Sequence, residues 1–234
     1  MPIFIAIPTY DRVNIFKRKT YNRIIKRYNL EKYTTLFIQS DKDAKEYKEA
    51  FPELKQVRSP KGYLNTLNFI GNHYPLNAKV VKIDDDITQI KKLQGNKLVD
   101  VNNAYDLFNK TFGIMSNVGA SVGGYYPIAS SSYMEDRQPI TTDLRFIKGG
   151  LYCFVNKRIK LKIDGKSDFE FTIENYKLNG KVVRLNHYTF RAELGYNTEE
   201  KGDTQKFLNK YEDYVSKVVK HKDGSTSFVL RKNP

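Results

Sequence analysis

The first 83 residues alternate between short apolar segments and longer segments with the residue spacing of an amphipathic helix. The first apolar segment is apolar almost throughout, as a strand buried on both faces requires. Such alternation is typical of an α/β fold with a parallel sheet. The predicted strands are residues 3–9, 33–40 and 78–83, and the predicted helices are residues 10–30, 42–51 and 63–74.

Polar residues gather where each of these strands would end. The three clusters are Thr9–Arg12, Gln39–Asp41 and Asp84–Asp86. Parallel strands present their carboxyl ends at one edge of the sheet, and ligands of open α/β sheets bind beyond that edge. The clusters therefore predict one shared binding site.

The third cluster consists of three consecutive aspartates at the end of an apolar strand. Adjacent carboxylates repel one another, so this arrangement is costly unless a positive group lies nearby. Carboxylate oxygens suit Mg²⁺ or Mn²⁺, and these ions keep coordination positions open for substrate phosphates. We expect a divalent cation here; a solvated acidic turn is the alternative.

The chain as a whole is strongly basic. Lysine and arginine total 40 against 26 acidic residues, which gives a formal net charge of +14. Such a charge attracts polyanions, of which nucleic acid is the commonest. The alternative is a lysine-rich composition that only keeps the surface soluble.

Cysteine content and hydropathy narrow the class of protein. The only cysteine, Cys153, excludes an internal disulfide framework and a cysteine-based metal site. The sequence contains no run of about 18 apolar residues, so it predicts no membrane-spanning helix. No basic leader precedes the first apolar segment, so we do not expect a signal peptide. We expect a cytoplasmic protein without a membrane partner; the sequence does not indicate its oligomeric state.

The second half of the chain mixes strands and helices less regularly. We expect an irregular segment at residues 120–139, in which Tyr125, Tyr126 and Tyr133 could line a cleft or simply pack in the core. Residues 203–234 predict a helix and then a hairpin that turns at Asp223–Gly224. The other predictions are helices over 101–119 and the middle of 167–180, and strands over 146–157 and 181–190.

The segments "IAIPTYDR" and "VVKIDDDI" together resemble the nucleotide-sugar-binding half of a GT-A glycosyltransferase. The resemblance covers about residues 2–195. It implies a Rossmann-like, mainly parallel sheet flanked by helices, with a nucleotide-sugar-binding half (1–100) and an acceptor half (101–195). Residues 196–234 would be a C-terminal helix and basic hairpin packed on the same domain. A DxD-type motif would hold the metal and the donor diphosphate.

The same resemblance assigns donor contacts. Asp84 would contact the ribose or a metal-bound water, Asp86 would ligate the metal, and Asp85 is the least defined of the three. Leu67 stands where the family has an arginine, and Arg58 or Lys61 could substitute for it. The remaining donor-binding candidates are Pro8, Thr9, Tyr10, Arg12, Gln39, Ser40, Asp41 and Asn68.

Acceptor and catalytic residues follow from the later segments. "KGGLYCF" is similar to the family's acceptor segment, where Gly149 and Gly150 would let a ligand approach the backbone. "SDFEF" is similar to an acidic loop that supplies the base, with Asp168 the first choice and Glu170 the second. His187 would be a third metal ligand or, equally, a structural histidine.

A closer resemblance is to the compact, TET-associated glycosyltransferases of bacteriophages, which modify hydroxymethylated pyrimidines in DNA. It implies a UDP-sugar donor and a DNA acceptor such as hydroxymethylcytosine, which the positive charge would help to bind. Tyr125, Tyr126 or Tyr133 would stack on a flipped-out base. The alternatives are the same fold acting on a polysaccharide, lipid-linked or protein acceptor, a non-catalytic nucleic-acid-binding module, and a nucleotidyltransferase.

Overall fold

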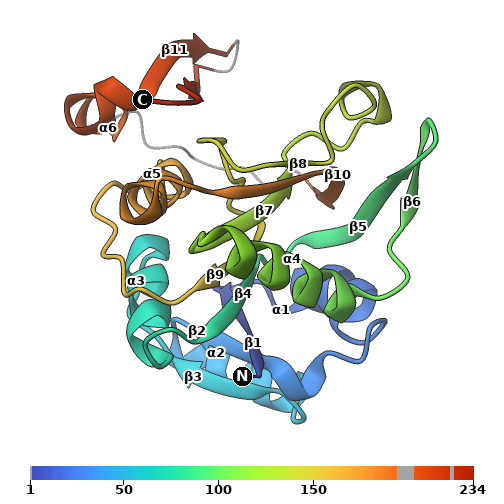
Figure 1. The fold of residues 1–234 in the computed structure, drawn as a ribbon. Helices are drawn as coiled ribbons and strands as arrows, with labels where there is room; N and C mark the ends of the chain where they lie inside the picture. The colour runs from blue at the N-terminus through green and yellow to red at the C-terminus, as the bar shows by residue number, and fades with distance from the viewer. Residues whose placement is uncertain (1, 194–202, 222–223) are drawn as a thin grey trace.

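The computed structural model describes residues 2–193, 203–221 and 224–234. In this part of the chain one ten-stranded sheet forms the centre of the molecule (Figure 1). Its strands are β1 (Ile3–Thr9), β2 (Thr34–Ile38), β3 (Lys55–Arg58), β4 (Lys79–Ile83), β5 (Ile87–Gln94), β6 (Lys97–Asp100), β7 (Val122–Tyr126), β8 (Ile140–Thr141), β9 (Leu151–Val155) and β10 (Val183–Ala192).

The strand order is β3-β2-β1-β4-β9-β7-β10-β5-β6, and β8 pairs with β10. Strands β3, β2, β1 and β4 are mutually parallel, and β9 lies antiparallel between β4 and β7. Thr9 pairs with Ile38, so β1 and β2 end at the same level. The predicted α/β fold with a mainly parallel sheet is confirmed, and the ends of its first strands share one edge.

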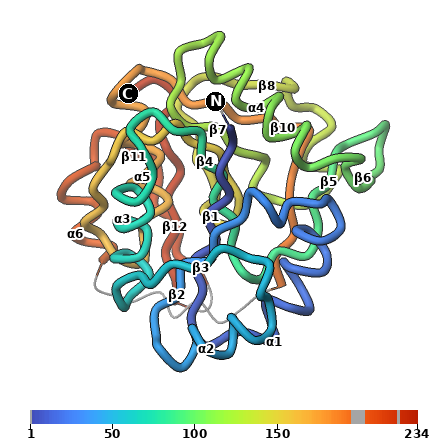
Figure 2. The backbone as a smooth tube through the Cα atoms, turned by 90° about the horizontal axis from the view of Figure 1, so that it is seen from below, coloured from blue at the N-terminus to red at the C-terminus, as the bar shows by residue number. Residues whose placement is uncertain are grey.

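Helices cover both faces of the sheet. Side chains alternate along β1: Ile5 and Ile7 belong to one buried cluster, and Ala6 belongs to the other. Figure 2 shows α3, α5 and α6 together on one side. The helices are α1 (Val13–Phe16), η1 (Lys17–Ile25), η2 (Glu31–Tyr33), α2 (Asp41–Ala50), α3 (Tyr63–His73), α4 (Ala104–Val118), η3 (Ser131–Tyr133), α5 (Ser167–Asn179), α6 (Asp203–Tyr211) and η4 (Glu212–Tyr214).

The helix predicted over residues 10–30 forms, but most of it has π-helical geometry. Lys26 N donates to Tyr21 O at 2.8 Å, five residues back. Ile24 and Ile25 are buried in the core beneath it. Such wide turns are rare and frequently occur at functional sites.

Two predictions of local structure were wrong, and two features were not predicted. Neither the edge strand β3, at residues 55–58, nor the β5–β6 hairpin was expected. The segment expected to be irregular contains the fully buried strand β7. The acidic "loop" at residue 167 is the first turn of α5.

The C-terminal helix and hairpin pack on α5. Strands β11 (Val215–Lys220) and β12 (Thr226–Leu230) pair antiparallel, as predicted. The Phe207 ring on α6 stacks on Phe228 with 4.5 Å between centroids. In the predicted turn, Gly224 has φ +84°, whereas Asp223 and the expected boundary at 195/196 lie outside the described residues. None of the described helices is long and apolar enough to cross a membrane.

Candidate functional site

The ends of β1 and β4 meet through the central aspartate of the triplet. Thr9 Oγ1 donates to Asp85 Oδ2 at 2.8 Å, and Arg12 Nη1 lies 3.3 Å from Asp85 Oδ1. The Tyr47 hydroxyl contacts Thr9 from α2. Burial raises the pKa of Asp85 to about 6, although the Arg12 guanidinium opposes this shift. Both oxygens of Asp85, which follows β4, contact groups at or after the end of β1. Asp85 therefore links the ends of these two strands.

Asp84 is held by a buried lysine from the same strand. The Lys82 side chain is 1% exposed, and its ammonium contacts the Asp84 carboxylate. Lys82 Nζ also donates to the Tyr63 hydroxyl and to Gly149 O, both at 2.6 Å. Tyr63 in turn donates to Asp84 Oδ1 at 3.3 Å. Lys82 therefore connects the aspartate triplet with the glycine pair before β9.

Asp86 is half-buried. Burial raises its pKa first of all, and the neighbouring Asp84 raises it further, while Arg12, Lys19 and Lys82 lower it. A carboxylate that has lost water and faces another carboxylate is stabilised by a cation.

The donor set fits a divalent cation in part. Asp84 and Asp86 offer the oxygen ligands that Mg²⁺ and Mn²⁺ prefer. Within the described ranges, no cluster of three or more His, Cys, Asp or Glu side chains could hold a metal. An ion bound by the two aspartates would therefore depend on substrate phosphates and water for its other ligands.

The backbone of the triplet is fixed from the π-helix. Thr20 Oγ1 donates to Asp84 O at 2.8 Å and accepts from Ile87 N at 2.8 Å. Thr20 is fully buried. One hydroxyl thus holds both ends of the turn that carries Asp85 and Asp86.

The glycine pair brings α5 and β10 close to the aspartates. Asp84 N donates to Gly150 O at 2.8 Å. A methyl group built on Gly149 would lie 3.1 Å from Asp168 Cβ, and one on Gly150 would lie 2.7 Å from the Phe190 ring. The space left by the missing side chains is thus occupied by Asp168 and Phe190, rather than open to a ligand as expected.

The two candidate bases occupy different environments. Asp168 lies half-buried in the first turn of α5, where the helix dipole favours a carboxylate. Glu170 is fully buried and accepts from Lys162 N, Ile163 N, Lys210 Nζ and Tyr211 OH at 2.7–3.1 Å. Glu170 therefore anchors α6 and does not face the aspartate site. Asp168, in contrast, lies beside Gly149 at this site.

His187 also lies away from the aspartates. His187 Nε2 contacts Arg137 O at 2.9 Å, and His187 lines a surface hollow with Lys92 and Lys110. It lies six residues before Glu193, which contacts Asp86 O, so about 20 Å separates His187 from the triplet. It is not placed as a ligand of a shared metal.

Tyr125 and Tyr126 are core residues of β7. Tyr125 is fully buried, and its hydroxyl lies 3.3 Å from Thr111 Oγ1. Tyr126 is 6% exposed and packs under the Arg184 guanidinium. Neither ring is free to stack on a substrate base. Tyr133, in contrast, is 56% exposed.

The candidates after β2 form a second group, next to the first because β2 and β1 are neighbours. Gln39 Oε1 accepts from Gly62 N at 2.7 Å, and Asp41 pairs with Arg58 at 3.1 Å. Ser40 caps α2 by accepting from Asp43 N. Lys61 and Tyr10 are exposed.

Asn68 has a structural environment instead. Its amide forms two hydrogen bonds with the backbone of Leu161, at 2.8 and 3.0 Å. Pro8 lies buried at the end of β1. The donor assignment of Pro8 remains an expectation, whereas the Asn68 side chain is already occupied.

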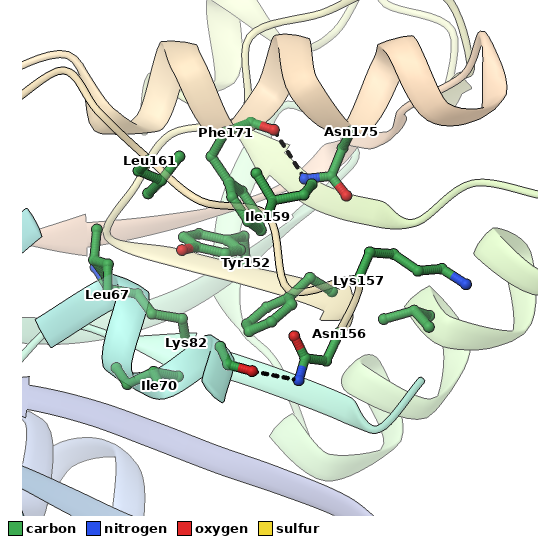
Figure 3. Close-up of a pocket in the computed structure, with 13 residues that line it drawn as sticks. Leu67, Ile70, Lys82, Tyr152, Asn156, Lys157, Ile159, Leu161, Phe171 and Asn175 are labelled. Atoms are coloured by element: carbon green, nitrogen blue, oxygen red, sulfur yellow. Dashed lines mark hydrogen bonds between the residues drawn. The ribbon is translucent and has the colours of Figure 1, made fainter. Parts of the chain in front are cut away.

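Behind the site, a mainly apolar cavity lies between α3, β9 and α5 (Figure 3). Lys82 and Tyr152 line it beside Ile70, and Leu67 closes it where the family resemblance expects an arginine. Asn175 Oδ1 is buried there and has no hydrogen-bond partner among the described residues. No residue of the aspartate triplet lines this cavity, so it is separate from the predicted metal site.

Sequence reasoning missed Lys82, Tyr63 and Thr20. The signal for Lys82 was present, because Lys82 and Asp84 lie two residues apart on a strand and share a face. A lysine in an otherwise buried strand needs an acidic partner there. Thr20 left no such signal, since its contact depends on how η1 packs.

No protein-family model matches the chain, and no curated protein matches it in sequence. Solved structures match its fold. Glucosyl-3-phosphoglycerate synthase from Mycobacterium tuberculosis, in complex with Mn²⁺ and UDP-glucose, aligns with TM-score 0.57 and 11% identity over 97% of this chain and 86% of that one. GalNAc-T7 with UDP, GalNAc and Mn²⁺ aligns with TM-score 0.55 and 10% identity over 83% of this chain.

S. aureus TarS 1–349 is a third match, with TM-score 0.53 and 12% identity over 81% of this chain. The chain spans 59% of that TarS structure and 43% of the GalNAc-T7 structure. All three are GT-A glycosyltransferases. The chain has a GT-A fold. At these identities the likeness concerns the arrangement of the chain and not its substrates.

Proposed function

We propose that this protein is a metal-dependent glycosyltransferase that transfers a sugar from a nucleotide-diphosphate sugar. One observation carries the proposal: Asp84, Lys82, Gly149 and Asp168 form a continuous constellation at the carboxyl edge of a GT-A sheet. It contains Asp84, which together with Asp86 would bind the metal, and, across the glycine, a separate carboxylate, Asp168, in the first turn of α5. The structural neighbours that hold Mn²⁺ with UDP or UDP-glucose support UDP-sugar as the donor.

Asp84 and Asp86 would hold Mn²⁺ or Mg²⁺ against the donor diphosphate. The ion would supply positive charge to stabilise the departing diphosphate. Thr20 and Lys82 fix the positions of the carboxylates, so little reorganisation is needed when the donor binds. Arg12, which is 38% exposed and lies 3.3 Å from Asp85, is an exposed cation for an additional phosphate contact.

Asp168 is the proposed base. It would accept the proton of the acceptor hydroxyl while the hydroxyl oxygen bonds to the anomeric carbon of the sugar. The bond from that carbon to the diphosphate oxygen breaks, and the diphosphate leaves with the electron pair. The Lys82 ammonium, bound to Gly149 O, keeps the backbone beside Asp168 in place.

The proposed acceptor is a hydroxymethylated pyrimidine base in bacteriophage DNA. The formal charge of +14 supports a polyanionic acceptor, because phosphate contacts dominate the affinity of proteins for DNA. Tyr133, exposed on η3, is the one tyrosine among the three candidates whose ring is available to stack on a base.

The decisive experiment is to incubate the protein with DNA containing 5-hydroxymethylcytosine, Mn²⁺ and a panel of UDP-sugars, and to weigh the released nucleosides. A nucleoside heavier by one sugar is the expected product. Addition of a nucleotidyl group, or no addition with any acceptor, contradicts the transferase assignment.

A small phosphorylated acid is the second candidate acceptor. The neighbour that covers nearly the whole chain has been solved with UDP-glucose and phosphoglyceric acid, an anion that basic residues would also attract. Including phosphoglyceric acid and a polysaccharide as competing acceptors separates these cases. Transfer to either of them, with none to DNA, would leave the glycosyltransferase in place and remove the DNA acceptor.

A further inference from the structure

The helix that begins beside the aspartate site has one strongly basic exposed face. The segment 17–27 contains six basic residues and no acidic one. Lys19, Thr20, Ile24 and Ile25 are buried beneath the helix. The exposed basic residues, here called the basic face, are Lys17, Arg18, Arg23, Lys26 and Arg27.

The π-helical geometry aligns these side chains. Exposed residues occur in pairs at 17–18, 22–23 and 26–27, which is a repeat of four to five residues. A π-helix bonds each residue to the fifth one along, so the pairs stack on one side. The face is at most about 16 Å long, which is the length of 11 residues in an ordinary helix. That length corresponds to at most about five base pairs of duplex at 3.4 Å each.

Few acidic groups neutralise this face in the described structure. Arg27 pairs with Asp100 at 3.1 Å, and the buried Lys19 pairs with the exposed Glu193 at 2.9 Å. Lys17, Arg18 and Lys26 form no ion pair within 4 Å among the described residues, although Glu193 also faces Arg18 and Arg23. The face thus keeps most of its charge available for a ligand.

Helix α2 shows that a lysine-rich composition alone does not produce this arrangement. Its ten residues contain three lysines and four acidic residues. Lys42 already has Asp11 and Glu46 nearby, at 4.0 and 3.9 Å. Positive charge is therefore segregated onto η1 and its C-terminal extension, and is balanced on α2.

The basic face also lies next to the proposed catalytic groups. Arg12, which precedes α1, contacts Asp85, and Thr20, on the inner side of η1, holds Asp84. A polyanion on the outer side of this helix is therefore bound to the same element that positions the triplet.

We propose that the basic face binds the sugar–phosphate backbone of the nucleic acid that carries the acceptor base. The identification of that nucleic acid as acceptor rests on the proposed function, but binding itself does not. Regularly spaced cations with few acidic neighbours among the described residues fit the regularly spaced phosphates of one strand. No base contact is needed, so the face binds duplex DNA regardless of sequence.

The test compares two triple variants with the same change of charge. Arg18→Gln/Arg23→Gln/Lys26→Gln removes three cations from the basic face, and Lys42→Gln/Lys45→Gln/Lys48→Gln removes three from α2. Binding of a 30-base-pair duplex is measured from 50 to 300 mM NaCl, without donor sugar. Circular dichroism confirms that both variants are folded.

We expect the slope of log affinity against log salt to become shallower by about 2.7 in the first variant, or 0.9 for each lost phosphate contact. The α2 variant should keep the wild-type slope. Equal changes in both variants would mean that only net charge matters, and would overturn the proposal.

The wild-type protein and the same two variants are then mixed with vesicles containing phosphatidylserine and with an acidic protein. If the wild type binds either of these and does not bind duplex, the proposal is also overturned. Binding to duplex by the basic face without transfer of sugar to DNA would instead contradict the proposed acceptor and leave this inference standing.

Discussion

The three adjacent aspartates differ because each faces a different neighbour. Asp85 accepts a hydrogen bond from Thr9 and pairs with Arg12, and Asp84 pairs with Lys82, while the pKa of Asp86 is raised by burial and by Asp84. The sequence alone could predict a cation at the triplet, since the residue types and their place after a strand are visible. It could not assign the individual roles, because these depend on partners as far away as residue 9.

Asp86→Asn tests the metal assignment. The amide keeps the shape of the side chain but removes the charge, so Mn²⁺-dependent hydrolysis of UDP-glucose should fall by about 100-fold or more. The rate is measured across a titration of Mn²⁺. Asp136→Asn, an exposed acid with the same loss of charge, is the control. Equal rates in wild type and the Asp86 variant would remove Asp86 from the metal site.

Lys82→Met tests whether the buried ammonium holds the site together. Removing it leaves Asp84, the Tyr63 hydroxyl and Gly149 O without their shared partner, so the free energy of unfolding should fall by about 3 kcal/mol. Urea denaturation measures this change. Adding Asp84→Asn to the variant should recover part of the loss, because the unpaired buried charge is then gone. Additive losses in the double variant would show that the two side chains do not interact.

The buried strands were predicted from the sequence more accurately than the partly exposed ones. Strands β1, β2 and β4 are almost completely buried and rich in β-branched and other apolar residues, and they were located within a few residues. Strand β3 and the β5–β6 hairpin are partly exposed at the sheet edge, and their mixed composition does not distinguish them from loops. The π-helical form of η1 leaves no clear pattern, because its buried residues also fit an ordinary helix.

Glu170→Gln tests the docking of α6 on α5. Glu170 accepts hydrogen bonds from two backbone amides and from Lys210 and Tyr211, and the new amide group would place a donor against donors. The free energy of unfolding should fall by about 3 kcal/mol. The turnover of the folded enzyme should stay close to that of the wild type.

The matched variant Asp168→Asn should behave in the opposite way. It should lose about 100-fold or more in sugar transfer, as expected for a missing base, while its stability changes by less than about 1 kcal/mol. Chemical denaturation and steady-state kinetics on both variants distinguish the two carboxylates. A catalytic loss in folded Glu170→Gln, with normal turnover in Asp168→Asn, would reverse their assignment.

At the scale of the whole molecule, the sheet order brings together segments that are far apart in sequence. Strand β9 pairs with β4, so residue 149 lies beside residue 84, and α5 follows on the same face. This pairing was not visible in the sequence, where the acceptor segment could be recognised only by resemblance. The net charge and the basic segment 17–27 were visible, but which of its basic residues are exposed on one face required the fold.

The exposure of these basic residues on one face predicts different salt dependence for two reactions of the same active site. Transfer to hydroxymethylated duplex needs the phosphate backbone, whereas transfer to a single 5-hydroxymethyl nucleoside does not. If all five cations of the basic face contact phosphates, the salt slope is about −4.5, and the KM for duplex rises about 500-fold between 50 and 200 mM NaCl. The KM for the nucleoside should stay nearly constant. Initial rates with both acceptors, measured at saturating UDP-sugar, test this difference. A duplex KM that is independent of salt would mean that the charge of this protein does not contribute to acceptor binding.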